Sequence, residues 1–119
     1  MANIPSITAS EFFNGIVKTG GNCVVDVWAE WCRPCKIVSP ILEELSDKYK
    51  NIRFYKINIG EYGNMDIAVK FGIKSVPTVL LVKDGKVVDK IVGTRDATHF
   101  EERIRKLLGD EDTEHIEGD

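Results

Sequence analysis

The sequence predicts an α/β domain of three layers, in which helices cover both faces of a central mixed β-sheet. Two observations lead to this prediction. Up to about residue 71, short β-branched runs alternate with segments whose apolar residues recur at helical spacing, which is typical of strands joined by crossover helices. Two further apolar runs then follow each other directly across Asp84-Gly85, which indicates an antiparallel hairpin. The expected order is β-α-β-α-β-α-β-β-α.

The first two elements are a short edge strand at residues 6–8 and a helix. Thr8 or Ser10 can cap this helix, because a hydroxyl there accepts from a free N–H of the first turn. Two glycines at residues 20–21 end it. Its apolar face consists of Phe12, Phe13, Ile16 and Val17.

A central strand is expected at residues 23–28, where three valines surround Asp26. Such a nearly continuous apolar run is typical of a strand that is buried on both faces. A long helix should follow from Pro34 to about Lys50, since proline is tolerated at a helix start. Pro40 lies inside this helix and should kink it. The apolar stripe of the helix consists of Ile37, Val38, Ile41, Leu42 and Leu45.

The second half of the chain begins with a strand at residues 52–58 and a polar loop at 60–63. A short helix is expected around 65–71. The β-branched runs at 78–82 and 87–92 should then form the hairpin.

The chain should close with an amphipathic helix at residues 97–108, stopped by Gly109. Residues 110–119 contain six acidic side chains and a single large apolar one, which cannot repay the entropy of ordering. We therefore expect one domain over residues 1–108 and a disordered acidic tail over 109–119.

Composition excludes several classes of function. At 119 residues and 43% apolar composition, the chain can bury a core without disulfides or metal ions. A net charge of −3 gives no general attraction to nucleic acid, and no apolar run approaches the roughly 18 residues that a membrane span needs. The first six residues lack the pattern of a signal peptide, and three cysteines do not form a secreted framework. The expected location is a reducing cytoplasm.

The feature that points to chemistry is the pair Cys32 and Cys35, placed where the central strand gives way to the long helix. Free N–H groups and the helix dipole favour an anion at a helix N-terminus, so the Cys32 thiol should ionise readily and act as a nucleophile. Cys35 lies one turn further on the same helix face, within reach of a disulfide. The pair is expected to be a reversible two-electron switch.

The surrounding residues resemble the active-site signature of the thioredoxin family. The run Trp28-Ala29-Glu30-Trp31-Cys32-Arg33-Pro34-Cys35-Lys36 carries the resemblance, which extends over roughly residues 6 to 108. Further matches in order and spacing are Asp26, Pro40, Lys56, Ser75-Val76-Pro77-Thr78 and Gly93.

Membership in that family implies the thioredoxin fold and general reduction of protein disulfides through Cys32 and Cys35. It also implies recycling by a flavin-containing thioredoxin reductase and no bound cofactor beyond the redox-active pair. We expect a monomer that maintains redox homeostasis in the cytoplasm and binds neither nucleic acid nor a membrane.

Asp26 and Lys56 are the candidate proton-handling residues. The valines beside Asp26 argue for burial, and a desolvated carboxylate has a raised pKa, so it could exchange a proton with Cys35. The alternative is a surface residue of a strand. One interpretation of Lys56 is a residue at a strand end whose ammonium group reaches water. The resemblance instead places Lys56 near Asp26, where it would tune that carboxyl group.

A substrate surface around Cys32 is the second candidate site. The resemblance implies a cis bond before Pro77, where a trans proline at a strand start is otherwise the common case. The Val76 backbone would then pair with an extended substrate. Gly93 is either a turn residue or a position kept open for that substrate. The expected substrate-contacting residues are Trp31, Arg33, Pro34, Ile73, Val76, Pro77 and Gly93, with Trp31 as an exposed lip.

Alternative functions follow from the same residues. A zinc site would need ligands beyond Cys32 and Cys35, and only Cys23, His99 and His115 are available. Among redox proteins, the alternative is a disulfide oxidant or isomerase. Among other classes, the alternative is a binding module that holds a partner through the same apolar surface, with no role for the dithiol.

The chain departs from the usual family pattern in two places. Arg33-Pro34 stands where Gly-Pro is commonest, which bears on the redox potential. Gly60 stands where an acidic residue is usual, which should affect only a loop. Cys23 should be buried, on the strand face opposite Asp26 and roughly 17 Å from the far end of its strand.

Overall fold

One mixed four-stranded sheet forms the centre of the molecule. The computed structural model describes residues 4–109 of the chain. The strands are β1 (Asn22–Trp28), β2 (Arg53–Asn58), β3 (Thr78–Lys83) and β4 (Lys86–Val92), and they lie side by side in the order β2-β1-β3-β4. β2 runs parallel to β1, whereas β3 is antiparallel to both β1 and β4. The predicted three-layer α/β class with a mixed sheet is confirmed.

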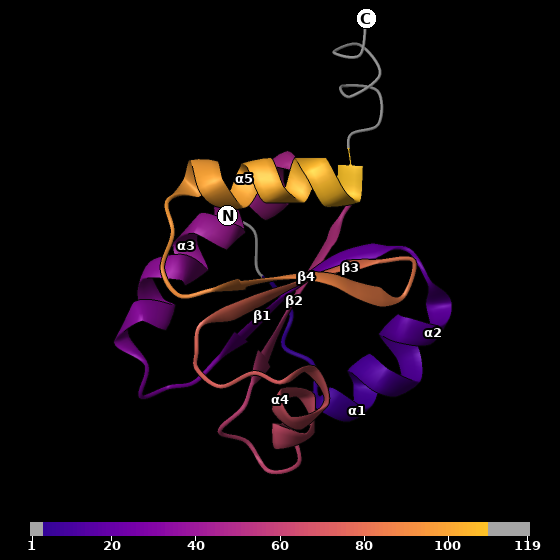
Figure 1. The fold of residues 1–119 in the computed structure, drawn as a ribbon, viewed down its shortest axis with the longest axis vertical. Coiled ribbons are helices and arrows are strands. Elements are labelled where there is room, and N and C mark those ends of the chain that lie inside the picture. Colours follow the sequence, from indigo (N-terminus) through magenta and orange to yellow (C-terminus); the bar gives the residue numbers. More distant parts are fainter. Residues whose placement is uncertain (1–3, 110–119) are drawn as a thin grey trace, which may run out of the picture.

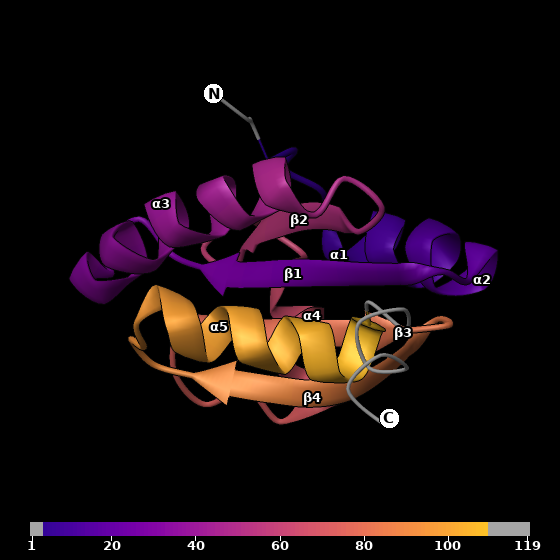
Figure 2. The same ribbon diagram turned by 90° about the horizontal axis from the view of Figure 1, so that it is seen from above.

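The helices form a layer on each face of this sheet (Figures 1 and 2). One layer consists of α3 (Arg33–Lys48) and α5 (Ala97–Ile104), which continues as the π-helical turn η2 (Arg105–Gly109). The other consists of α1 (Ala9–Glu11), the π-helical turn η1 (Phe12–Ile16), α2 (Val17–Thr19) and α4 (Met65–Phe71). Among the described residues, no helix is both long and apolar enough to cross a membrane.

β1 lies between the two layers, and its alternating side chains enter two different cores. Val24 packs with residues of α3 and α5, including Leu42 and Phe100. Cys23, Val25 and Val27 point to the opposite face, where they pack with residues such as Phe12 and Ile67. Since strand side chains alternate, Asp26 shares the face of Val24 and is directed toward α3.

Local signals account for several element boundaries. Thr8 caps α1 in a reciprocal capping box with Glu11, as one of the two predicted caps. The β3–β4 hairpin turns through Asp84 and Gly85, both of which have positive φ. A Cβ atom on Gly85 would lie 2.3 Å from the Val17 carbonyl oxygen, so glycine is also required for the close approach of α2.

A few boundaries differ from the prediction. The expected N-terminal strand is a single parallel bridge between Ser6 and Lys56, in which the Lys56 N–H donates to the Pro5 carbonyl and the Ile7 N–H donates to the Lys56 carbonyl. α3 begins at Arg33 and ends at Lys48, slightly earlier at both ends than predicted, with Pro40 inside it. The last helical turn includes Gly109, which was expected to lie beyond it. The proposed disordered tail at 110–119 lies outside the described residues.

Candidate active site

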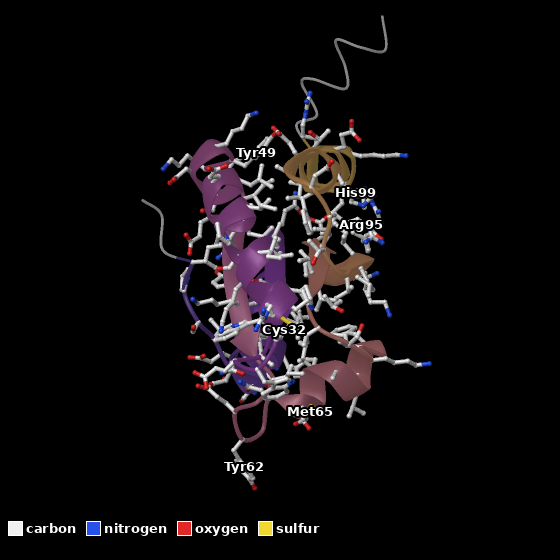
Figure 3. The ribbon with its side chains drawn as sticks, turned by 90° about the vertical axis from the view of Figure 1, so that its left-hand side faces the viewer. Cys32, Tyr49, Tyr62, Met65, Arg95 and His99 are labelled. Carbon is white, nitrogen blue, oxygen red and sulfur yellow. A yellow bond between two sulfur atoms is a disulfide. The ribbon has the colours of Figure 1, made fainter. Side chains whose placement is uncertain are left out.

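The two cysteines of the motif form a disulfide at the junction of β1 and α3. Their Cα atoms are 5.4 Å apart. Cys32 is the N-cap residue of α3, and the Cys35 N–H donates a hydrogen bond of 3.2 Å to its sulfur. In the reduced protein the same N–H and the helix dipole would stabilise a Cys32 thiolate. Figure 3 shows Cys32 and its sulfur near the middle of the view, with Met65 and Tyr62 below it.

Asp26 lies behind the disulfide and is 3% exposed. Burial raises the pKa of its carboxyl to about 7, and Lys56 on the neighbouring strand opposes part of this increase. Its Oδ1 atom is buried and has no hydrogen-bond partner among the residues that the structure describes. The carboxyl group can therefore change its protonation state near neutral pH.

A cavity of about 100 Å³ connects this carboxyl group with the second cysteine. It exceeds the space that one water molecule needs, and several of its lining groups are polar. Lys56 Nζ lies 5.7 Å from the centre of the Trp28 ring, over one of the walls. The lining residues are Asp26, Trp28, Cys35, Lys36, Ser39 and Lys56.

The segment before β3 closes the site on the other side. The Val76–Pro77 peptide bond is cis, as the resemblance implied. The Val76 carbonyl oxygen lies 3.5 Å from Cys32 Sγ, and the Val76 side chain packs against the cluster of Ala29, Cys32 and Cys35. The Gly93 N–H donates to the Pro77 carbonyl oxygen at 2.9 Å, which brings the end of β4 to the same place.

Comparison with known proteins gives one consistent result. Residues 3–106 match the family model described as Thioredoxin. Thioredoxin of Pseudomonas aeruginosa is 39% identical over 92 residues, covering 76% of this chain and 83% of that protein. Thioredoxin-1 of Saccharomyces cerevisiae is 43% identical over 90 residues, covering 76% and 84%. The crystal structure of oxidised mitochondrial thioredoxin 3 from the same yeast has a TM-score of 0.78 at 34% identity, with 87% and 95% coverage.

The chain belongs to the thioredoxin family. Proteins of this family are disulfide oxidoreductases that act by dithiol–disulfide exchange, using their own cysteine pair in place of a bound cofactor. They work with thioredoxin reductase and protein disulfides. The Cys32–Cys35 disulfide gives this chain the redox-active pair that such chemistry needs, and the predicted fold and reaction class are confirmed.

The other sequence-predicted residues of the thioredoxin-type site differ in their exposure. Arg33 and Pro34 are exposed on the first turn of α3, whereas Pro77 is buried and Ile73 is half-buried against the α1/α4 core. Gly93 has a φ of +86°, so its backbone conformation by itself favours glycine, as the turn interpretation expected. The nearest atom that a Cβ there would meet is 3.6 Å away.

The two tryptophans of the thioredoxin signature have different environments. Trp28 is half-buried beside the cysteines, whereas Trp31 is 72% exposed, in agreement with its predicted place at the lip. A Cβ on Gly60 would lie 2.8 Å from the Trp31 ring. Gly60 was expected to affect only a loop, yet the close contact shows that it also determines where Trp31 can lie.

Cys23 stands apart from the thioredoxin-type pair, as predicted. It is 2% exposed, and burial raises the pKa of its thiol to about 11 against a smaller opposing effect of Arg53. It lies on the α1/α4 side of β1, opposite Asp26. In the described part of the chain, no three side chains of the metal-binding types converge, so the zinc interpretation has no ligand set there; His115 lies outside that part.

Two contributors were missed by reasoning from the sequence. Ser39 lines the cavity of Asp26 and Cys35, and its position four residues after Cys35 on one helix was a signal for this. Asn64 is buried, and its side chain joins the Asn58 carbonyl to the Ala9 N–H. No local pattern predicts a contact between residues 55 positions apart.

Proposed function

We propose that this chain is a general reductase of protein disulfides in which Trp31-Cys32-Arg33-Pro34-Cys35 is the active-site motif. Cys32 is the attacking residue and Cys35 the resolving one. The observation that carries this assignment is the hydrogen bond from the Cys35 N–H to Cys32 Sγ at the start of α3, because it stabilises negative charge on the first sulfur.

The reaction runs in two exchanges. The Cys32 thiolate attacks one sulfur of a substrate disulfide, that S–S bond breaks, and the other substrate sulfur leaves as a thiolate. Cys35 then loses its proton and attacks Cys32 Sγ, which releases the second substrate thiolate. The substrate gains two electrons, and the pair is left as the disulfide that the structure contains.

Asp26 is proposed to accept the Cys35 proton in the second exchange. Support comes from its pKa of about 7 and from the cavity that it shares with Cys35, which is large enough for a water molecule to relay the proton. Lys56 is proposed as a positioning residue. Its positive charge lowers the pKa of Asp26 and so keeps that carboxyl group able to give its proton up again.

The substrate is proposed to bind across the surface around Cys32. Trp31 offers an exposed apolar ring, and the 3.5 Å approach of the Val76 carbonyl to Cys32 Sγ would let an extended substrate pair with that backbone beside the reacting sulfur. The remaining contact residues are proposed to be Arg33, Pro34, Ile73, Pro77 and Gly93.

The cellular setting is proposed from the family. A flavin-containing thioredoxin reductase would return the disulfide to the dithiol, and the chain would act as a monomer in the cytoplasm, over a domain of residues 1–108. Neither nucleic acid nor a membrane is a proposed partner, since the net charge is −3 and the chain has no long apolar run.

The test is catalytic turnover of a protein disulfide such as insulin, with dithiothreitol as the electron source. The wild type should turn over, and Cys35→Ser should stall after one attack as a mixed disulfide through Cys32. Cys23→Ser is the matched control and should keep full turnover, because Cys23 lies on the other face of β1. A chain that only binds partners would show the same behaviour in all three forms, which would refute the proposal.

A further inference from the structure

The loop after β2 and the first turns of α4 expose three large apolar side chains that the proposed mechanism does not use. Tyr62 is fully exposed, and Val69 and Met65 are 79% and 55% exposed. Their spacing of four residues places Met65 and Val69 on one side of α4, and Tyr62 lies in the turn three residues before Met65. Ile67 and Ala68, on the other side of the helix, are buried. We call Tyr62, Met65 and Val69 the apolar strip.

Hydrogen bonds hold the backbone that carries this strip. Asn58 Oδ1 accepts from the Gly60 N–H at 2.8 Å, and the Asn58 carbonyl accepts from the Glu61 N–H and from the Asn64 side chain. Asn64 is buried and in turn accepts from the Ala9 N–H at the start of α1. These hydrogen bonds connect the loop to β2 at one end and to α1 at the other. The backbone that carries Tyr62 is therefore ordered already and loses little conformational entropy when a partner binds.

The loop that carries Tyr62 lies next to Trp31, the residue before the reactive Cys32. Gly60 packs so closely under the Trp31 ring that a Cβ would meet two ring atoms at 2.8 and 3.3 Å. Trp31 precedes Cys32, and Tyr62 follows Gly60 by two residues, a span of at most about 7 Å. Figure 3 shows Tyr62 directed away from the body of the molecule, with Met65 between it and Cys32 in this view.

We propose that the apolar strip extends the substrate-binding surface along α4 and binds an apolar segment next to the disulfide of a protein substrate. This inference rests on the reductase function proposed above. A small disulfide reaches Cys32 without touching the strip, whereas a protein segment that leaves the reacting sulfur past Trp31 would lie over it. Exposed charges of both signs border it, Asp66 and Lys70 among them, so apolar contact and not net charge selects the partner.

The consequence is a preference among protein disulfides. The strip should contact the apolar residues beside the cystine both in the first complex and in the transition state of the attack. It should therefore raise kcat/KM for such substrates. Replacing all three residues of the strip by serine should lower kcat/KM for such a substrate about tenfold, which corresponds to about 1.4 kcal/mol.

The experiment compares two synthetic peptides with the same intramolecular disulfide, one flanked by Leu and Phe and the other by Ser and Gly. Pre-reduced protein is mixed with each peptide, and with oxidised glutathione, in a stopped-flow instrument. The triple variant Tyr62→Ser, Met65→Ser, Val69→Ser should lose about tenfold on the apolar peptide. Its rates on the polar peptide and on glutathione should equal those of the wild type.

Two single variants form a matched control. Val69 and Val88 are both exposed valines, but Val88 lies on β4 at the β-bulge of the β3–β4 pair, outside α4 and outside the loop after β2. Val69→Ser should slow the reduction of the apolar peptide about two- to threefold, and Val88→Ser should leave its rate unchanged.

The possible failures are distinguishable. Equal rates of the wild type and the triple variant on the apolar peptide would overturn the docking surface and leave the reductase function intact. If the triple variant reacted more slowly with both peptides and with glutathione to the same degree, the docking surface would also be overturned. The three residues would then affect the cysteine pair itself and not the binding of the substrate. If the wild type reduced neither peptide, the reductase function itself would be wrong.

Discussion

Asp26 and Lys56 are register partners on the neighbouring parallel strands β1 and β2. Burial penalises the carboxylate of Asp26 more than the ammonium of Lys56 stabilises it, so the pKa of Asp26 rises to about 7. If the charge of Lys56 fully offset the desolvation of Asp26, the carboxylate would stay ionised at neutral pH and could not take a proton from a thiol. Because the offset is incomplete, Asp26 can act as an acid–base group. For the same reason, ionised Asp26 destabilises the folded protein.

The stability cost should depend on pH. The unfolded chain ionises Asp26 near its ordinary pKa of 3.8, whereas the folded protein keeps the proton until about 7. Below pH 3.8, Asp26 is protonated in both the folded and the unfolded chain, and its cost to stability vanishes. The cost grows as the pH rises from 3.8 to about 7, and it is constant above that. The three-unit difference corresponds to about 4 kcal/mol at most. Asp26→Asn should therefore gain unfolding free energy over wild type by up to about 4 kcal/mol between pH 4 and pH 8.

Urea denaturation of oxidised protein across that pH range measures this gain. Asp66→Asn makes the same chemical change at an exposed aspartate of α4, and its unfolding free energy is measured alongside as the matched control. A difference between Asp26→Asn and the wild type that does not change with pH would mean that the Asp26 carboxyl group is not desolvated in solution.

Asp26→Asn should also slow the second exchange more than the first. The amide cannot accept the Cys35 proton, whereas the Cys35 N–H that stabilises the Cys32 thiolate is unchanged. Stopped-flow kinetics with a chromogenic disulfide separate the two steps. We expect resolution to slow by about 10²-fold or more near pH 7, with attack changed little. Selective slowing of attack would contradict the assigned role.

Arg33 should make the protein a better oxidant than a form with glycine at this position. Its positive charge, in the turn between the cysteines, stabilises the Cys32 thiolate and hence the reduced state. Arg33 is exposed, so the effect is screened and should be on the order of 10–20 mV. Equilibration with a glutathione buffer should give Arg33→Gly the more negative potential. An equal or less negative value would show that the charge does not act on the sulfur.

Cys23 should react slowly with thiol reagents in the oxidised native protein. Its thiol is 2% exposed and has a pKa raised to about 11, so only a trace of thiolate is present at neutral pH. Labelling followed by mass spectrometry should find the thiol modified only after denaturation. Fast labelling, or a disulfide between two molecules through Cys23, would show that the start of β1 opens in solution.

Gly60→Ala should move the Trp31 ring while costing little stability. The new methyl group would meet the outer atoms of an exposed indole, which can swing away without disturbing the core. In protein labelled with 5-fluorotryptophan, we expect the fluorine resonance of Trp31 to shift and that of Trp28 to stay. Gly15→Ala, where a Cβ meets no atom within 4 Å, should shift neither resonance. An unmoved Trp31 signal in Gly60→Ala would refute the close contact.

The sequence by itself determined those features that depend on a few neighbouring residues. The positions of Cys23 and Asp26 in the β1 run place them on opposite faces, because strand side chains have a period of two. The dipeptide Asp84-Gly85 accepts the positive φ angles of a tight hairpin, and the helix that starts after Cys32 puts that sulfur at a helix N-terminus. Each of these depends on local backbone geometry, which short patterns encode.

Only the tertiary structure decided which distant residues meet at the site. Cys32 and the Val76 carbonyl are 44 positions apart, and the Trp31 ring lies over a glycine of a different loop. Ser39 joins Asp26 in one cavity because α3 packs across β1 at a particular height. The predicted edge strand became a single bridge, in which Pro5 and Ile7 bond to the backbone of Lys56. Such contacts depend on how whole elements pack, and packing is a property of all the side chains between them, which no local pattern contains.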